Sequence, residues 1–503
     1  MRTGSRIPVT AVLAAAVLLM AATVAFAVPR ASAAAPAIDW KPCPAPSART
    51  LQCAQVEVPM DWRDPSGKKI SFGVNRLPAT ARAERIGTLV FNPGGPGGSG
   101  TQWVATEAAK GGMFGKDVRS RYDLVGFDPR GVASSRPAVR CDNEIWNSPR
   151  VSLFPTSAEQ YEQMADKYER LGRSCLELTG PAVRFMDTVS VARDLEALRN
   201  AVGEGKLNYL GLSYGTEIGQ QYSQLYPENV RRMVLDGALV HSLEASSFNE
   251  NESVAYEATL GRFAQWCARS TDCALKGRDV LAAFSELVRK ADAEPIPAAV
   301  CAKSAACRTS VTGEDIRFAA QGYLLFPSGL PQMGYPGWRE LGDALKSAEQ
   351  GDASAFSPRI IEQQTDAAFS GLAVGCLDNR ADFKGYPALK AQIALGKVVS
   401  PHVQGAGQSY QYIAQCTDWP TAFTNPPKPA APNQTRALIV NALYDPSTAY
   451  AWAQLMATQM PNSVLLTRDG AGHTSYTHAG PTRDAIDRYL LSGVLPAPGT
   501  FIK

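Results

Sequence analysis

Strand-like and helix-like segments alternate along this chain, and no other feature restricts its fold as strongly. Short apolar or alternating runs bounded by turn residues recur at 55–60, 69–76, 87–92, 122–127, 207–212, 230–235, 437–443 and 463–467. Helical periodicity lies between or after them, at 158–178, 189–202, 216–225, 449–459 and 482–491. Such alternation predicts an α/β fold, in which helices cover both faces of a mostly parallel sheet.

One long stretch breaks this rhythm. From 238 to 432 the chain has helix-like segments such as 254–269 and 278–293 but no clean strand repeat. A Pro- and Asn-rich segment at 424–434 then leads back to the alternation. We therefore expect a single α/β core built from 34–237 and 433–503, with 238–432 inserted as a mostly helical cap and return segment.

The first 33 residues have the pattern of a secretory signal peptide. Arg2 and Arg6 precede an apolar run at 9–28, and Ala31-Ser32-Ala33 forms a small-residue cleavage site. A retained membrane anchor is the alternative, because the run is long enough to cross a bilayer. We expect cleavage after residue 33, an extracellular protein, and no stable membrane association afterwards.

Charge and cysteine content fit such a protein. The 503 residues carry 50 Lys and Arg against 47 Asp and Glu, and Arg2, Arg6 and Arg30 of the leader account for the whole excess of +3. A neutral mature chain lacks the basic surface that nucleic-acid binding needs, so we expect no nucleic-acid partner.

Ten cysteines, an even number, fit disulfides formed in an oxidising compartment. Short spacings favour local pairs, and the remaining cysteines pair by elimination; the expected bonds are Cys43–Cys53, Cys267–Cys273, Cys301–Cys307, Cys141–Cys175 and Cys376–Cys416. There is no C-x-x-C motif, and four histidines are not spaced as zinc ligands, so we expect neither a metal nor a cofactor.

The sequence Gly211-Leu212-Ser213-Tyr214-Gly215 matches G-x-S-x-G. The five-residue pattern alone is weak evidence for a catalytic serine, but here a strand-like run precedes it and a helix-like run follows. In that context small residues let a strand turn sharply into a helix, which presents the serine hydroxyl at the sheet edge. We interpret Ser213 as a nucleophile; an ordinary turn serine is the alternative.

A serine nucleophile needs a base and a carboxylate that orients the base. His473 follows the glycines of a loop after the last strand, whereas His478 lies farther on among polar residues and reads as a surface or supporting histidine. Asp445 ends the preceding strand, which gives the chain order Ser, Asp, His. Asp469 competes with Asp445 but shares a short loop with His473.

Acyl transfer also needs N–H donors for the developing oxyanion. The Tyr214 N–H directly follows the nucleophile, and the glycine-rich loop 92–98 offers a second donor, expected at Gly95. Phosphate binding by that loop is the alternative, but the Lys-Ser/Thr ending of a P-loop is missing.

Together these motifs resemble the secreted tripeptidyl-aminopeptidase family of actinomycetes. The resemblance covers nearly all of the mature chain and rests on four segments: Asn92-Pro93-Gly94-Gly95-Pro96-Gly97, Gly126-Phe127-Asp128-Pro129-Arg130-Gly131, Gly211-Leu212-Ser213-Tyr214-Gly215-Thr216 and Tyr444-Asp445-Pro446. It implies an α/β-hydrolase fold with Ser213, Asp445 and His473 as the triad. The sequence departs from the family at Ala449, where Pro is frequent, and this leaves specificity open.

The resemblance also implies a secreted enzyme that releases short peptides, typically tripeptides, from peptide substrates with a free N-terminus. Such an enzyme must bind an α-ammonium group, and the cap offers Glu250, Glu252, Glu257 and Asp378 as carboxylates, among which the sequence does not choose. The alternatives are a carboxylesterase or endopeptidase with the same triad, and a non-catalytic binding protein of this fold. The oligomeric state is left open.

Overall fold

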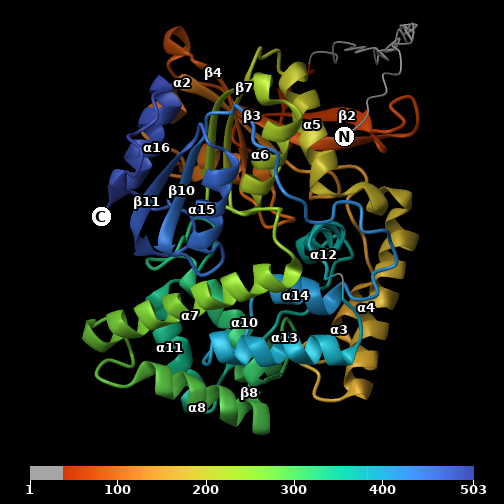
Figure 1. The fold of residues 1–503 in the computed structure, drawn as a ribbon, viewed down its shortest axis with the longest axis vertical. Helices are drawn as coiled ribbons and strands as arrows, with labels where there is room; N and C mark the ends of the chain where they lie inside the picture. The colour runs from red at the N-terminus through yellow and green to blue at the C-terminus, as the bar shows by residue number, and fades with distance from the viewer. Residues whose placement is uncertain (1–37, 382) are drawn as a thin grey trace, which may run out of the picture. The chain divides into compact units, whose positions relative to one another are not determined.

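A ten-stranded sheet forms the centre of the computed structural model, which describes residues 38–381 and 383–503 (Figure 1). Its strands lie in the order β1-β2-β3-β5-β4-β6-β7-β10-β11-β12. Their bounds are β1 Lys41–Pro42, β2 Gln52–Pro59, β3 Lys69–Leu77, β4 Gly87–Asn92, β5 Tyr122–Phe127, β6 Leu207–Leu212, β7 Val230–Asp236, β10 Leu438–Tyr444, β11 Val464–Ala471 and β12 Phe501–Ile502. All neighbours from β5 to β12 in this order are parallel, whereas β1–β2, β2–β3 and β3–β5 are antiparallel pairs, so β1 and β3 run against the other strands.

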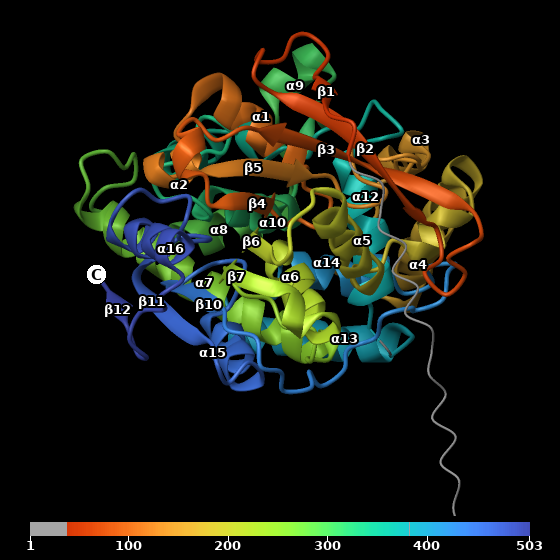
Figure 2. The same cartoon turned by 90° about the horizontal axis from the view of Figure 1, so that it is seen from above.

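Helices cover both faces of this sheet, as the alternation predicts (Figure 2). One face carries α1 Gly100–Lys110, α2 Lys116–Arg121 and α16 Pro481–Ser492, and the other carries α5 Thr188–Ala201, α6 Tyr214–Leu225 and α15 Tyr450–Gln459. Strands β4, β5 and β6 are buried along their whole length because they lie between the two layers. The α/β-hydrolase architecture is therefore confirmed.

The stretch between β7 and β10 is mostly helical. It contains α7 Ala245–Arg269, α8 Val280–Ala293, α9 Ala299–Ser304, α10 Gly313–Leu324, α11 Trp338–Glu349, α12 Ala367–Asp378, α13 Tyr386–Val399 and α14 Gln408–Gln415, with a small hairpin of β8 Ile296–Pro297 and β9 Ser310–Val311. Helices α7, α8, α10 and α11 enclose a core of their own. Helices α12 and α14 instead bury their apolar side chains in the same core as the sheet.

Two elements of the first half also contact these helices. Helix α3 Asn143–Asn147 and helix α4 Ala158–Thr179 follow β5, and α4 packs against α14. The Tyr410 hydroxyl on α14 donates to the Leu153 carbonyl at 2.7 Å. The helical part of the molecule therefore contains α3 and α4 as well as the helices between β7 and β10.

Two segment ends differ most from the sequence-based expectation. Helix α7 begins at Ala245, nine residues before the expected start at 254. Its first turns carry Phe248, Asn249 and Glu252, which are buried but mainly polar, so apolar periodicity does not reveal them. Strand β11 continues to Ala471 because Arg468 and Ala471 pair with β10, although neither belongs to an apolar run.

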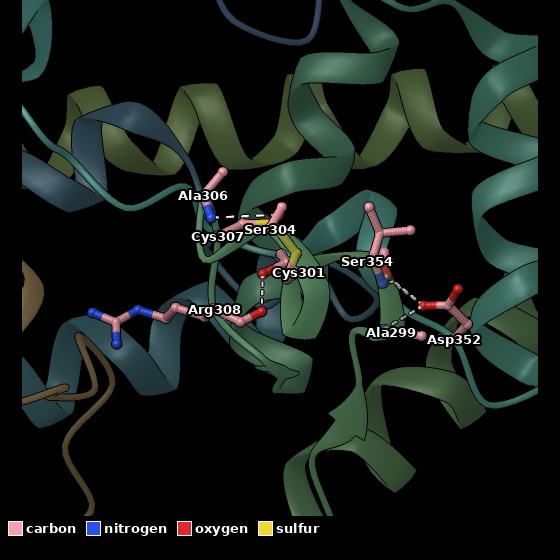
Figure 3. Close-up of a disulfide and its surroundings, with 10 residues drawn as sticks. Ala299, Cys301, Ser304, Ala306, Cys307, Arg308, Asp352 and Ser354 are labelled. Carbon is pink, nitrogen blue, oxygen red and sulfur yellow. Dashed lines mark hydrogen bonds between the residues drawn. A yellow bond between two sulfur atoms is a disulfide. The ribbon is translucent and has the colours of Figure 1, made fainter.

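All five expected disulfides are present, and every cysteine is bonded. The Cys301–Cys307 bond closes a short loop after α9 (Figure 3). The Cys376–Cys416 bond joins the ends of α12 and α14. Within the described residues, no helix is both long and apolar enough to cross a membrane. The predicted leader and its cleavage site at Ala31-Ser32-Ala33 lie outside them.

Candidate active site

Ser213 stands between β6 and α6 in a backbone conformation that side chains rarely adopt. Its φ is 55° and its ψ is −127°. A Cβ atom on Gly211 would lie 2.4 Å from the Gly215 carbonyl, and one on Gly215 would lie 2.7 Å from the Asn92 carbonyl. The two flanking glycines therefore permit a sharp strand-to-helix turn, as the motif predicts.

His473 and Asp445 come from the neighbouring strand ends. Asp445 follows β10 and His473 follows β11, and the Nδ1 atom of His473 lies 2.9 Å from each carboxylate oxygen of Asp445. Asp445 also accepts the N–H groups of Ser447 at 2.9 Å and of Thr448 at 2.8 Å, and the Thr448 hydroxyl at 2.7 Å. The carboxylate is fully buried and is held by several donors.

The charges of this pair shift both pKa values. Burial alone would raise the pKa of Asp445, but His473 and the hydrogen bonds outweigh burial and lower it. Burial alone would lower the pKa of His473, but the Asp445 carboxylate outweighs burial and raises it. An ionised Asp445 therefore favours a protonated imidazole, as a serine hydrolase needs when the serine proton moves to its base.

Ser213 and His473 both lie close to the end of β7. The Ser213 N–H donates to the Asp236 carbonyl at 2.9 Å. A Cβ atom on Gly237 would lie 3.4 Å from Cε1 of His473. The end of β7 therefore contacts both of the loops that carry these residues.

The glycine-rich loop after β4 lies directly against the turn at Ser213. A Cβ atom on Gly94 would lie 2.7 Å from the Tyr214 nitrogen and 2.9 Å from the Ser213 Cβ atom. Neither the Tyr214 N–H nor the Gly95 N–H donates to a protein acceptor in the part of the chain that the structure describes. The sequence predicts Gly95 and Tyr214 as the N–H donors of this site. It does not predict the role of Gly94, whose lack of a side chain lets the loop approach Ser213 and Tyr214 closely.

The other histidines have different surroundings. His478 is partly buried near His473, and its Nε2 atom lies 3.4 Å from the His473 carbonyl oxygen, while burial lowers its pKa to about 4. His402 pairs with Glu257, and His241 pairs with Glu217 at 2.9 Å. Asp469 is exposed on β11. None of these residues donates a hydrogen bond to Asp445, as His473 does.

A narrow pocket opens beside Ser213, between the sheet edge and the cap helices. It has about 20 Å³ of free space, little more than one water molecule needs. Its walls come mainly from the glycine-rich loop after β4, the loop after β10, α7 and α14; the lining residues are Gly95, Pro96, Ser213, Tyr214, Leu239, Phe248, Glu252, Asn379, Gln408, Ser409, Tyr412, Ser447, Thr448 and Trp452. Phe248 and Trp452 stack with ring centroids 4.0 Å apart.

Glu252 is the one acidic residue among those that line this pocket. Its carboxylate is only 2% exposed and accepts Gln321 Nε2 at 2.8 Å, Gln408 N–H at 3.2 Å, and both the N–H and the hydroxyl of Ser409. All four donors are neutral. Burial therefore raises the pKa of Glu252, and the hydrogen bonds only partly offset that effect.

A second group of buried charges does not line the pocket and connects α6, the segment after β7, and α12. We call Glu217, His241 and Asp378 the buried acid cluster. Asp378 accepts Thr188 Oγ1 at 2.5 Å and Asn425 Nδ2 at 2.8 Å, and Thr188 Oγ1 also contacts the Tyr214 hydroxyl. No set of three or more His, Cys, Asp or Glu side chains within 38–381 and 383–503 is arranged as metal ligands.

The fold and these strand ends define the class of this protein as a serine hydrolase. A family model described as "alpha/beta hydrolase fold" matches residues 87–297, and one described as "TAP-like protein" matches residues 401–501. Carboxylesterase B of Mycobacterium tuberculosis is 31% identical over 490 residues, which cover 93% of this chain and 90% of that protein. The chain belongs to the family of α/β hydrolases that contains these enzymes and the tripeptidyl aminopeptidases.

Two further relatives are peptidases by name. Serine protease Hip1 of Mycobacterium tuberculosis is 29% identical over 485 residues, which cover 92% of this chain and 90% of that protein. Tripeptidyl aminopeptidase of Streptomyces coelicolor is 39% identical over 246 residues, which cover 48% of this chain and 45% of that protein.

Proposed function

We propose that this protein is a secreted serine aminopeptidase that releases short peptides, typically tripeptides, from peptide substrates with a free N-terminus. The observation that carries this proposal is the buried Glu252 carboxylate in the wall of a narrow pocket next to Ser213. A buried carboxylate with neutral partners is stabilised when a cation comes near. The α-ammonium group of a peptide is a cation of suitable size.

In the proposed reaction, His473 removes the proton of the Ser213 hydroxyl while Ser213 Oγ attacks the scissile carbonyl. Asp445 holds the imidazole by its Nδ1–H group and stabilises the imidazolium. The free N–H groups of Gly95 and Tyr214 stabilise the oxyanion, and removal of one such donor costs about 3 to 4 kcal/mol of transition-state stabilisation. His473 then donates its proton to the leaving amine, and water hydrolyses the acyl-enzyme.

Several features support secretion. Five disulfides fit an oxidising compartment, and the sequence begins with a pattern typical of signal peptides.

Carboxylesterase activity is the second candidate function. The relative that is 31% identical over most of both chains is named a carboxylesterase, and the same triad can cleave both esters and amides.

The deciding experiment compares chromogenic amides of Ala-Ala-Pro, of N-acetylated Ala-Ala-Pro and of Ala, together with a p-nitrophenyl ester. Each is assayed with the purified protein and with Ser213→Ala, which should be inactive on all of them. Cleavage restricted to the free tripeptide supports the aminopeptidase. Equal cleavage of the acetylated peptide indicates an endopeptidase, and turnover of the ester alone indicates a carboxylesterase.

Glu252→Gln tests how the ammonium group is bound. The variant keeps the shape of the side chain but removes its charge, so kcat/KM for the free tripeptide should fall about 10- to 100-fold. A fluorophosphonate has no ammonium group, so the rate at which it inactivates the enzyme through Ser213 should change much less. Glu250→Gln, two residues away on α7 and outside the pocket lining, is the matched control and should leave both values unchanged. An equal loss in peptide cleavage and in inactivation would contradict an ammonium site at Glu252.

A further inference from the structure

The backbone that follows His473 is strained. Thr474 has a φ of 55°, a conformation that β-branched residues rarely adopt. Such a conformation persists only where surrounding contacts enforce it. The Thr474 N–H donates to Asp445 at 3.2 Å, which fixes one side of the loop. The other side is fixed by a residue that the triad does not include.

That residue is Asp236, at the end of β7. Its carboxylate is fully buried and accepts the Ser475 N–H at 2.9 and 2.7 Å and the Tyr476 N–H at 2.6 Å. Its backbone carbonyl accepts the Ser213 N–H at 2.9 Å. One residue therefore contacts both the turn that carries Ser213 and the loop that carries His473.

Arg468 on β11 also holds this loop. Its guanidinium donates to the Ala471 carbonyl at 3.0 Å, the Gly472 carbonyl at 2.9 Å and the Ser475 hydroxyl at 3.1 Å. Burial lowers the pKa of Arg468, and the Asp236 and Asp445 carboxylates oppose that effect. The loop is thus held by a partly buried cation and a fully buried carboxylate.

We propose that Asp236 is a positioning residue for the catalytic base, whose side chain fixes the His473 loop while its backbone carbonyl fixes the nucleophile turn. This inference rests on the proposed roles of Ser213 and His473. It adds a second carboxylate to the site, at a strand end different from that of Asp445. Asp236 acts through the loop backbone and touches neither substrate nor the reacting atoms.

The charge of Asp236 has a measurable consequence. The charged or titratable groups that face His473 and Asp236 are Asp445, Arg468, Glu252 and His478. Burial raises the pKa of Asp236 to about 6, although the hydrogen bonds from the Tyr476 and Ser475 N–H groups act to lower it. Its negative charge in turn contributes to the raised pKa of His473. Removal of that charge should therefore lower the pKa of His473.

The test measures inactivation by a fluorophosphonate as a function of pH. In that reaction Ser213 Oγ forms a bond to phosphorus, fluoride leaves, and the serine proton passes to His473, so no peptide specificity is involved. Asp236→Asn should react about 10- to 100-fold more slowly at pH 8. The midpoint of its acid limb should lie about one pH unit below that of the wild type. A ¹⁵N NMR titration of the His473 imidazole should show the same displacement.

Arg468→Met is the control for a merely structural role. It removes contacts from the same loop but leaves the Asp236 charge, so it should slow the reaction without lowering the midpoint. If Asp236→Asn keeps the wild-type midpoint, the inference is wrong. If Asp236→Asn does not fold, Asp236→Glu decides: it keeps the charge but displaces the carboxylate from the Ser475 and Tyr476 N–H groups, so it should slow the reaction at an unchanged midpoint, and a wild-type rate overturns the inference. Reaction of Ser213→Ala or full-rate reaction of His473→Ala would instead refute the proposed function.

Discussion

At the scale of single residues, the candidate site combines local strain with buried charge. Ser213 and Thr474 both have positive φ values. Ser213 is the proposed nucleophile, and Thr474 directly follows the proposed base, His473. The sequence identifies Ser213 because the G-x-S-x-G motif reports a backbone geometry. It does not identify Asp236 or Thr448, because their importance lies in contacts with residues more than 20 positions away along the chain.

The strain at Ser213 leads to a prediction about stability. Ser213→Gly and Ser213→Ala should both be inactive, but glycine adopts a positive φ without a steric penalty. Ser213→Gly should therefore be more stable than Ser213→Ala, by about 1 kcal/mol. Urea unfolding followed by circular dichroism gives both free energies of unfolding. Equal stabilities would show that the turn carries no strain.

At the scale of elements, two helices from distant parts of the chain form the pocket wall opposite Ser213. Helix α7 supplies Phe248 and Glu252, and α14 supplies Gln408, Ser409 and Tyr412. The Cys376–Cys416 disulfide fixes the end of α14 to the end of α12. The sequence predicts the disulfide, but which helix lines the pocket follows from packing.

This arrangement predicts an effect of the Cys376–Cys416 bond on substrate binding. The double variant Cys376→Ser, Cys416→Ser should lose about 4 kcal/mol of stability, from the chain entropy of a loop with a sequence separation of 40 residues. Its KM for the free tripeptide should rise, because α14 is held less firmly against Glu252. Thermal unfolding and steady-state kinetics measure the two effects.

The Cys301–Cys307 pair provides the comparison (Figure 3). It closes a loop with a sequence separation of 6, and none of its flanking residues lines the pocket. Its removal should cost only about 2 kcal/mol and leave KM unchanged. A similar rise of KM in both double variants would mean that general loosening, not the position of α14, controls binding.

At the scale of the whole molecule, the buried acid cluster joins parts of the chain that are far apart in sequence. His241 lies after β7, Glu217 on α6 and Asp378 on α12, and Asn425 belongs to the return segment. Burial lowers the pKa of His241, but Glu217 and Asp378 outweigh burial and raise it to about 9. Burial and the nearby Glu217 carboxylate raise the pKa of Asp378 to about 8.

These shifts predict that stability falls as pH rises. The ion pair of His241 stabilises the folded state fully below pH 6.5, and this contribution is lost as pH rises through about 9. Asp378 acts in the same direction, because the folded state keeps a proton that the unfolded state releases above about pH 4. The free energy of unfolding should therefore decline between pH 6 and pH 9.5, as measured by urea titrations at each pH.

His241→Gln should remove much of this slope. The variant leaves Glu217 buried without its partner, so at pH 6 it should be about 3 kcal/mol less stable than the wild type, with a smaller difference at pH 9.5. His402→Gln, which removes a partly exposed partner of Glu257, should leave the slope unchanged. A wild type whose free energy of unfolding is constant from pH 6 to pH 9.5 would show that protonation of His241 and Asp378 does not affect stability.

The sequence by itself determined the alternation of strands and helices and the residues that follow β6, β10 and β11, and its short cysteine spacings favoured three of the five disulfides. These features depend on periodicity, on turn residues and on neighbours close along the chain, all of which are visible in a one-dimensional pattern. Only the tertiary structure decided that Glu252, rather than Glu250 or Glu257, lines the pocket, and that Asp236 contacts the His473 loop. Burial and hydrogen bonding between distant segments determine these roles, and neither property is a function of local sequence.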